Sequence, residues 1–233
     1  MANGKPTLYH LNNSQSQTIL WLLEELGIEY DLKLFNRIEQ RSPPELKETH
    51  PTGKSPQLMT PTGRVITERS AIALYLIETY DTSSKFKIPS PPAQADDDFL
   101  KEDSLISFGN STVMPLFMLR LVFMQLVKRT PFFLRWLVST ISSTLDKAFL
   151  SAEIELHLSY FDSLLEGREY VMGGAEPTRA DFVNLWYFDW GAQGKYYEVP
   201  KYKNIDAWRQ RCLSRPAWKR ALEKGNGYDL SEG

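Results

Sequence analysis

The sequence predicts an α+β protein of two domains, a small mixed domain followed by an all-helical domain. Residues 7–80 alternate short apolar runs with helical stripes, in the order β-α-β-α-β-β-α. The stretch 81–98 is rich in proline and serine and has no apolar stripe, and the chain after it carries helical periodicity alone. We therefore expect domains at 1–82 and 96–233, joined by a linker at 83–95.

Composition places the chain among soluble globular proteins. Its 233 residues are 42% hydrophobic and 24% charged, enough to bury a sizeable core. A net charge of −2 argues against a nucleic-acid partner, because it would repel phosphates. The lone cysteine excludes a disulfide within the chain and suits a reducing, cytoplasmic compartment. Charges interrupt the apolar stretch 113–141 and the N-terminus has no apolar signal core, so we expect no transmembrane segment.

The first strand, over 7–10, leads into a helix over 14–26. The apolar side chains of this helix recur at helical spacing and form one stripe: Ile19, Leu22, Leu23 and Leu26. Ser14, followed three residues later by Gln17, is a capping-box pattern and predicts the start of the helix. Gly27 stands where a left-handed C-terminal cap belongs.

The rest of the mixed domain follows from alternation, capping and turn signals. Alternating polarity predicts a strand over 29–36. Ser42 with Glu45 predicts a short capped helix. Two short apolar runs around a proline–glycine turn predict a hairpin over 56–68, and a helix over 68–80 completes the domain.

The helical domain is predicted from its stripes and caps. One apolar face persists over about three turns: Ile154, Leu158, Phe161 and Leu165. Thr178 with Asp181 forms a threonine–acid cap, to which we assign a structural role. The last helices span 204–222 and carry Cys212, which we expect to be a packed thiol.

Four stretches of the chain together resemble the cytosolic glutathione transferases, and in particular a fungal subgroup of them. They are SQSQTILWLLEELGIEYD, HPTGKSPQL, ITERSAIALYL and TRADF, in that order. The resemblance covers nearly the whole chain. It implies a thioredoxin-like N-terminal domain that holds glutathione, an all-helical C-terminal domain, and a homodimer.

The implied chemistry requires the thiol of glutathione to ionise. A free thiol has a pKa near ~8.5 and is only about 3% thiolate at pH 7, so the protein must stabilise the anion. Ser14 matches the serine that opens the family motif, at a helix start where a hydroxyl and the helix dipole both favour an anion. The alternatives are that Ser14 only caps the helix, or that Asn13, Asn12 or Ser16 donates to the sulfur. No cysteine lies near this turn, which argues against a covalent disulfide route.

The resemblance also implies how the cysteinyl and glycyl parts of glutathione are held. Pro56 is expected to follow a cis bond, and the main chain of Ser55 to pair with the cysteinyl part like an added strand. Lys54 and Arg41 are expected to face the glycyl carboxylate, and a solvated lysine and an exposed arginine are the plain alternatives. Glutathione is the implied co-substrate, and the three histidines show no metal-ligand spacing.

Glu68 and Arg69 are the residues expected at the γ-glutamyl end. The resemblance implies that Glu68 pairs with the ammonium group; a helix-start acid favoured by the macrodipole is the alternative. Arg69 replaces the family serine whose N–H binds the α-carboxylate. It keeps that N–H and adds a guanidinium, so it either preserves binding or blocks the pocket.

The electrophile pocket is expected on the first long helix of the second domain, at Phe108, Ser111 and Thr112, although such a face is more often core. The implied activity is attack of the thiolate on an apolar electrophile, in detoxification or secondary metabolism, without a covalent enzyme intermediate. Two alternatives stay open: a non-catalytic binding or regulatory module, and a glutathione-dependent peroxidase or isomerase.

Overall fold

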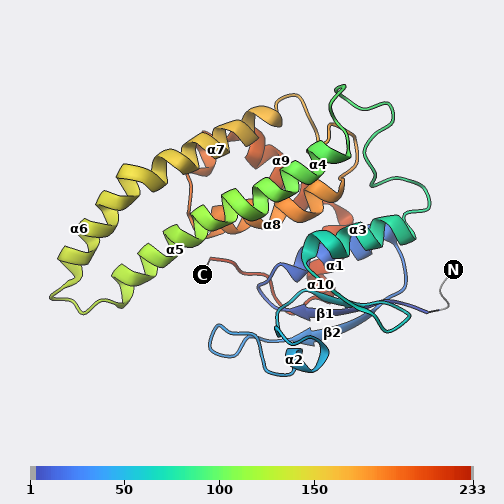
Figure 1. Ribbon diagram of the computed structural model, residues 1–233, viewed down its shortest axis with the longest axis horizontal. Helices are drawn as coiled ribbons and strands as arrows, with labels where there is room; N and C mark the ends of the chain where they lie inside the picture. Colours follow the sequence, from blue (N-terminus) through green and yellow to red (C-terminus); the bar gives the residue numbers. More distant parts are fainter. Residues whose placement is uncertain (1–3, 232–233) are drawn as a thin grey trace.

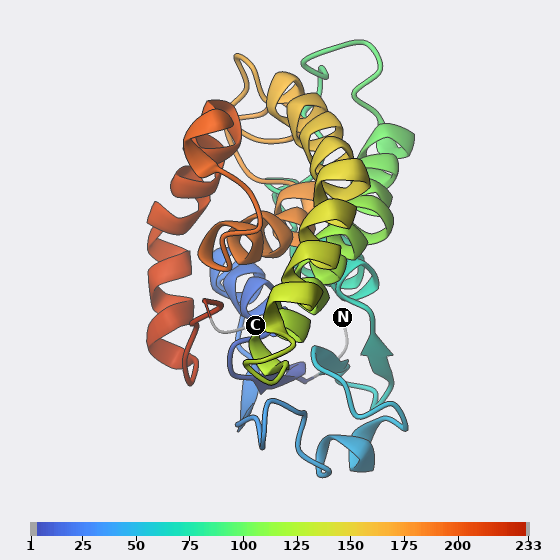
Figure 2. The same cartoon turned by 90° about the vertical axis from the view of Figure 1, so that its left-hand side faces the viewer.

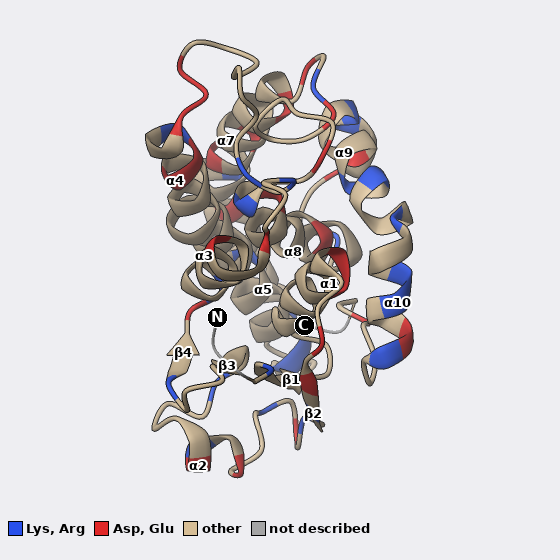
Figure 3. Ribbon diagram, turned by 90° about the vertical axis from the view of Figure 1, so that its right-hand side faces the viewer, with Lys and Arg blue, Asp and Glu red and all other residues tan. Residues whose placement is uncertain are grey.

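A computed structural model describes residues 4–231 of the chain, and its sheet is small and mixed. The strands are β1 Thr7–Leu11, β2 Asp31–Phe35, β3 Gln57–Met59 and β4 Val65–Thr67. Their order is β2-β1-β3-β4 (Figure 1), with β1 parallel to β2 and antiparallel to β3. β3 and β4 form the predicted hairpin. Three helices flank the sheet, with α1 Ser16–Leu26 and α3 Arg69–Tyr80 on one side and the short α2 Leu46–Thr49 on the other (Figures 1 and 3).

The second part of the chain is helical and is dominated by two long antiparallel arms. The first arm is α4 Phe99–Phe108, the π-helical turn η1 Gly109–Val113 and α5 Met114–Arg129; the second is α6 Arg135–Leu145, the π-helical turn η2 Asp146–Leu150 and α7 Ser151–Leu164. The remaining elements are α8 Arg179–Gln193, η3 Val199–Lys201, α9 Lys203–Ser214 and α10 Pro216–Lys224. We call α5, the turn 130–134 and α6 the hairpin; it projects beyond the rest of the molecule (Figures 1 and 2). This architecture confirms the predicted α+β fold.

The apolar stretch 113–141 folds as two helices because Pro131 lies in the turn between them. Within the described chain, the continuous helix over 99–129 is long and apolar enough, by length and composition, to cross a membrane. Only 28% of its most apolar window is buried, so much of that apolar surface faces outward. The absence of a transmembrane segment stays a prediction.

The first turn of α1 differs from the predicted capping box. The helix begins at Ser16, its N-cap residue is Gln15, and no side chain caps it. The Ser14 hydroxyl instead donates to the carbonyl oxygen of Leu11, at 2.7 Å. The other end is as predicted, because Gly27 adopts φ +62° and its N–H closes the helix.

The short helix α2 also starts later than its sequence pattern indicates. Its N-cap is Glu45, which makes no side-chain capping bond, so the predicted box with Ser42 does not form. The physical reason is that Ser42 and Pro43 each precede a proline, and a residue in that position avoids helical backbone angles.

The helix α1 is buried on all sides rather than along one stripe. The side chains of residues 19–23 are fully buried, because α3, α8 and α10 surround the helix above the sheet. Its acidic end is fixed by α10 (Figure 3), since Arg220 donates to Glu24 at 2.9 Å and Lys224 also pairs with it. The last helix of the chain therefore completes the packing of the first.

The predicted Thr178–Asp181 cap is present and holds three segments together. The buried Asp181 carboxylate accepts hydrogen bonds from the Thr178 N–H (2.8 Å), the Val171 N–H (3.0 Å) and the Trp208 indole N–H (2.7 Å). The Thr178 hydroxyl is a fourth donor, at 3.1 Å. Burial raises the pKa of Asp181 to about 6. Cys212 is fully buried, as predicted for a packed thiol, and burial raises its pKa.

We predict that Asp181→Ala lowers the free energy of unfolding by about 3–5 kcal/mol, because several buried donors lose their acceptor. Urea unfolding followed by circular dichroism measures this loss. Asp206→Ala removes an exposed carboxylate that pairs with Arg209 at 2.8 Å, and should cost less than about 1 kcal/mol. Equal losses of unfolding free energy in the two variants would contradict the prediction, because the Asp181 hydrogen bonds would then stabilise the fold no more than the Asp206–Arg209 ion pair does. Asp181→Asn is the milder substitution to use if the alanine variant does not fold.

A second prediction concerns His10, which is fully buried in β1. Burial lowers the pKa of its imidazole to about 4, and its Nε2 has no hydrogen-bond partner among the described residues. In the unfolded chain the pKa is about 6.5, so only the unfolded state binds a proton as pH falls from about 6.5 to 4. The free energy of unfolding should drop by up to about 3 kcal/mol over this window. His10→Asn should remove that part of the slope in urea titrations at several pH values; identical slopes in both proteins would refute the prediction.

Candidate binding and catalytic site

A groove of about 300 Å³ opens between the first turn of α1, the segment before β3 and the start of α3. Its lining residues come from these three places: Gln15, Thr52, Lys54, Ser55, Pro56, Thr67, Glu68 and Arg69. The structure thus brings together the residues predicted from two separate motifs. Arg41 is not among them, because it lies exposed in the tight turn that it forms with Ile38.

The segment before β3 presents its main chain to the groove. The Ser55–Pro56 bond is cis, as the resemblance implied. The Ser55 hydroxyl donates to the carbonyl oxygen of Tyr9 at 3.0 Å, and the Gln57 amide donates to the carbonyl oxygen of Lys54 at 2.8 Å. Pairing between β1 and β3 begins at Gln57, so the Ser55 main chain lies outside it. An extended peptide can therefore align along this segment.

The start of α3 offers both signs of charge to the groove. Glu68 has φ +65°, unusual for a residue with a side chain, and its exposed carboxylate forms no ion pair with the described residues. The first intrahelical bond of α3 runs from Ile72 back to Glu68, so three N–H groups of the first turn have no helical acceptor. A helix start of this kind favours an anion, and Glu68 beside it favours a cation. An α-amino acid terminus carries both groups.

Arg69 lies at the edge of the groove with its side chain turned into the protein. It is 4% exposed, and its guanidinium carbon lies 4.4 Å from the ring centroid of Tyr187 on α8. All three guanidinium nitrogens are buried without a hydrogen-bond partner among the described residues. Burial lowers the pKa of the group, and the phenol of Tyr187 opposes that shift. Its backbone N–H belongs to the free first turn of α3, while the guanidinium stacks against the helical part.

The Ser14 and Ser16 hydroxyls, which were predicted as candidates to activate a thiol, are buried and form hydrogen bonds with neighbouring residues. Ser14 is 4% exposed, and its Oγ also accepts from the Ser16 N–H at 3.2 Å. The Ser16 Oγ accepts from the Leu11 N–H at 3.1 Å and lies 3.0 Å from Nδ1 of His10. Both hydroxyls therefore fix the turn between β1 and α1. Their role at a thiol stays a prediction.

Asn13 is placed differently from its neighbours. It is half-buried with φ +49°, and its Oδ1 accepts from the Asp229 N–H at 2.8 Å. Its main chain is held by Gly227, which accepts its N–H at 3.1 Å, and by Arg37, which donates to its carbonyl oxygen at 3.1 Å. Because Oδ1 is fixed, the amide NH₂ group is turned away from the tail and donates to none of the described residues. Asn12 likewise uses its Oδ1 to accept from the Arg37 N–H, and its NH₂ group also donates to none of the described residues.

A second cavity, of about 430 Å³, lies between α5, the loop before α2 and the C-terminal segment. Leu121, Met124, Lys128 and Arg129 of α5 line one side, and Gln40, Gly194, Tyr196 and Ser231 line the rest. The residues predicted for an electrophile pocket are elsewhere. Phe108 stacks on Phe161 of α7, and Ser111 is exposed. In this region Asn110 accepts a hydrogen bond from the Tyr187 hydroxyl of α8, and Thr112 is half-buried.

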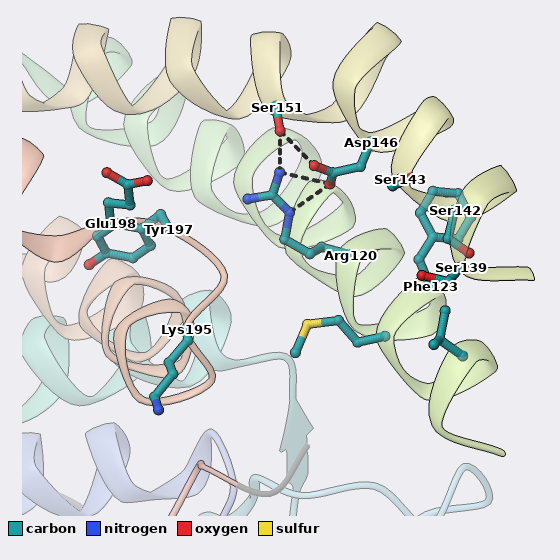
Figure 4. Close-up of a pocket in the computed structure, with 12 residues that line it drawn as sticks. Arg120, Phe123, Ser139, Ser142, Ser143, Asp146, Ser151, Lys195, Tyr197 and Glu198 are labelled. Atoms are coloured by element: carbon teal, nitrogen blue, oxygen red, sulfur yellow. Dashed lines mark hydrogen bonds and ion pairs between the residues drawn. The ribbon is translucent and has the colours of Figure 1, made fainter. Parts of the chain in front are cut away.

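A larger cavity, of about 770 Å³, lies within the helical part and away from the predicted site residues (Figure 4). Arg120 of α5 crosses it and donates to Asp146 at 2.8 Å and to the Ser151 hydroxyl at 2.8 Å. Three serines of α6 line its other wall: Ser139, Ser142 and Ser143. Among residues 4–231, no three histidine, cysteine or acidic side chains gather as they would around a metal ion.

Sequence reasoning missed Gln15, Thr52, Thr67 and Arg37. Gln15 lies between Ser14 and Ser16, the two serines predicted as thiol donors. It reaches the groove only because α1 starts one residue after it. Arg37 lies 24 residues after Asn13, and nothing in its local sequence indicates that contact. The positive φ of Asn13 is the one feature that a local signal could have suggested, because asparagine tolerates that conformation.

Comparisons with known proteins agree with this geometry. Residues 14–79 match the family described as "Glutathione S-transferase, N-terminal domain", and residues 131–216 match "Glutathione S-transferase, C-terminal domain". Glutathione S-transferase 3 of Schizosaccharomyces pombe is 34% identical over 218 residues, covering 93% of this chain and 86% of that protein. Glutathione S-transferase 1 of Saccharomyces cerevisiae is 22% identical, covering 93% and 94%.

Two solved structures are similar over nearly the whole chain. A glutathione S-transferase from Actinobacillus pleuropneumoniae has a TM-score of 0.75 and 30% identity, covering 98% of this chain and 96% of that one. A glutathione transferase homologue from Lodderomyces elongisporus, solved with two glutathione molecules per subunit, has a TM-score of 0.71 and 19% identity, covering 94% and 98%. The second likeness is one of fold alone.

Proposed function

The chain belongs to the glutathione S-transferase family, and on this premise we propose that it binds glutathione in the 300 Å³ groove and transfers its thiolate to apolar electrophiles. The observation that supports this proposal most directly is the arrangement of charged and polar groups at the start of α3. There the Glu68 carboxylate, which forms no ion pair within residues 4–231, lies beside three N–H groups without helical acceptors. This pair suits the ammonium and α-carboxylate of the γ-glutamyl end.

The rest of glutathione follows the groove. The cysteinyl part aligns along the main chain of Ser55, as an added strand would. Lys54 is exposed at the groove edge and is the cation offered to the glycyl carboxylate. Arg41 lies outside the groove and has at most a long-range influence on that carboxylate. The Arg69 guanidinium leaves the groove free, because it stacks on α8.

We propose that Asn13, the rival to Ser14, stabilises the thiolate. Its NH₂ group, like that of Asn12, has no acceptor among the described residues, whereas the Ser14 hydroxyl is buried and donates to Leu11. The start of α1 adds a favourable dipole, and Arg37 brings a positive charge to the Asn13 carbonyl oxygen. The turn thus offers an amide and a cation to an anion beside it.

The electrophile is proposed to enter the 430 Å³ cavity. Leu121 and Met124 give that cavity an apolar wall, and its position beside the C-terminal segment places it near Asn13. The thiolate then attacks the electrophile and displaces a leaving group or adds to an activated double bond. The protein supplies proximity and anion stabilisation, and no covalent bond to the enzyme forms.

We also propose that the protein is a cytoplasmic homodimer that acts in detoxification or secondary metabolism. Exposed apolar side chains on α3 and at the start of α4 support the dimer: Leu74, Phe99 and Leu100. Adjoining patches of this kind suit a contact between copies. The alternatives are a non-catalytic binding module and a glutathione-dependent peroxidase or isomerase, and a conjugation assay with a chromogenic aryl halide separates them from transfer.

We predict that Glu68→Ala weakens glutathione binding by roughly 30- to 150-fold, because the ammonium group loses a charged partner worth about 2–3 kcal/mol. Isothermal titration calorimetry measures the affinity. Glu48→Ala removes an exposed carboxylate of α2 outside the groove and serves as the matched control. An unchanged affinity in Glu68→Ala would place glutathione elsewhere.

The thiolate donor is tested by three variants of one turn. Asn13→Gly keeps the left-handed backbone and removes the amide, so the pKa of the bound thiol should rise by ~1–2 units. Ser14→Ala should lower the melting temperature without moving that pKa, because its hydroxyl serves the fold. Asn12→Ala is the amide control. The readout is ultraviolet titration of the bound thiolate, and a shift confined to Ser14→Ala would assign the role to Ser14 instead.

A further inference from the structure

The hairpin ends in an exposed tip that is both aromatic and basic. We define the tip as residues 128–137, the end of α5, the connecting turn and the start of α6. Phe132 is 83% exposed, Trp136 69% and Phe133 60%. Three cations lie among them, all exposed: Lys128, Arg129 and Arg135. None of the three forms an ion pair with any residue of the described chain, so the tip presents free positive charge around free aromatic rings.

The positive charge of the tip is part of an uneven distribution of charge along the sequence. The 42 residues over 104–145 contain no aspartate or glutamate and four basic residues, a net charge of +4. The whole chain has a net charge of −2, so the remainder carries −6. Arg120 is the fourth cation and is held inside by Asp146. The other three cations, Lys128, Arg129 and Arg135, lie at the tip of the hairpin. Figure 1 shows that this hairpin projects from the molecule.

Helix α6 leaves four large apolar side chains exposed: Trp136, Leu137, Ile141 and Leu145. Its serines line the 770 Å³ cavity (Figure 4), and among them only Ser142 is buried. A surface helix of a soluble protein turns large apolar side chains of this kind towards the core. Of the 21 large hydrophobic residues exposed in the described chain, 13 lie between Met118 and Phe149. A concentration of this size marks an interaction surface.

We propose that the hairpin tip docks on the surface of an anionic phospholipid bilayer, with Phe132, Phe133 and Trp136 inserted at the headgroup level. Aromatic rings favour the membrane–water interface, and basic side chains beside them are attracted to anionic headgroups. The contact is peripheral, because Arg120 of α5 is charged and is paired with Asp146 on the inner side of the helix pair.

A second copy of the chain fits this surface less well. A twofold contact joins a patch to itself, and here it would bring six unpaired cations together without an acid among them. The patch proposed for the dimer, at Phe99 and Leu100, lies at the other end of the helix over 99–129, about 45 Å away along its axis. The docking surface is therefore separate from that dimer, whereas its Lys128 and Arg129 also line the cavity proposed for the electrophile.

The test is sedimentation of the full chain with vesicles, compared with two variants. One set of vesicles is phosphatidylcholine alone, and in the other about a third of the lipid is phosphatidylserine. We expect the chain to bind the second set and to bind it less at high salt. The charge variant K128Q/R129Q/R135Q should bind about a hundredfold more weakly, since each cation near an anionic surface contributes about fivefold. The aromatic variant F132S/F133S/W136S should also lose binding.

The matched control is R64Q/K203Q/K219Q, which removes three exposed cations that lie off the hairpin and form no ion pair in the described chain. It should bind anionic vesicles as the unmodified chain does, and melting temperatures confirm that all variants fold. Absence of binding by the unmodified chain, or equal binding by the charge variant, overturns the proposal. Light scattering gives a further outcome that overturns the proposal: the unmodified chain self-associates in a form that does not bind vesicles, and the aromatic variant, but not the control, loses this self-association. The hairpin would then be a contact between copies.

Discussion

The buried carboxylate of Asp181 is the constraint from which the site is built. It collects donors from the loop before α8, from the cap of α8 and from α9, so it fixes where α8 begins and how it lies. Helix α8 in turn presents the Tyr187 ring on which the Arg69 guanidinium stacks. An arginine at the start of α3 is compatible with an open groove only because that ring receives it. The buried Asp181, which does not line the groove, thus determines which side chain the edge of the groove can carry.

The groove also depends on how the ends of the chain meet. Glu24 and Glu25 at the end of α1 are held by basic residues of α10 and the segment before it. Because α1 is surrounded by helices, its first turn cannot move independently of them. That turn carries Asn13, whose amide is oriented by the C-terminal segment. The two parts of the molecule are therefore joined at the place where the chemistry is proposed, and not merely connected by a linker.

Much of the fold could be predicted because its signals are local. The end of α1 at Gly27, the Thr178–Asp181 cap and the β3–β4 hairpin each depend on a few neighbouring residues. The site was predicted less well. The Ser14 hydroxyl had a competing acceptor in Leu11, which the capping pattern does not reveal. The contacts of Asn13 with the C-terminal segment span more than 200 residues and leave no periodicity to detect. The exposure of large apolar side chains on α6 depends on which neighbour covers that helix, and the sequence pattern does not show this.

The contact between Asn13 and the segment 227–229 has a consequence for biosynthesis. Domains generally fold in the order in which the ribosome makes them, so the sheet and α1 can form early. The turn before α1 has local bonds of Ser14 and Ser16 and a bond from Arg37, but its contacts with the N–H of Asp229 and the carbonyl of Gly227 are made more than 200 residues later. A nascent chain therefore lacks these two contacts while its first segments fold. On the role proposed above for Asn13, its amide is oriented only once translation has passed Asp229, so a truncated product would be compact and yet inert.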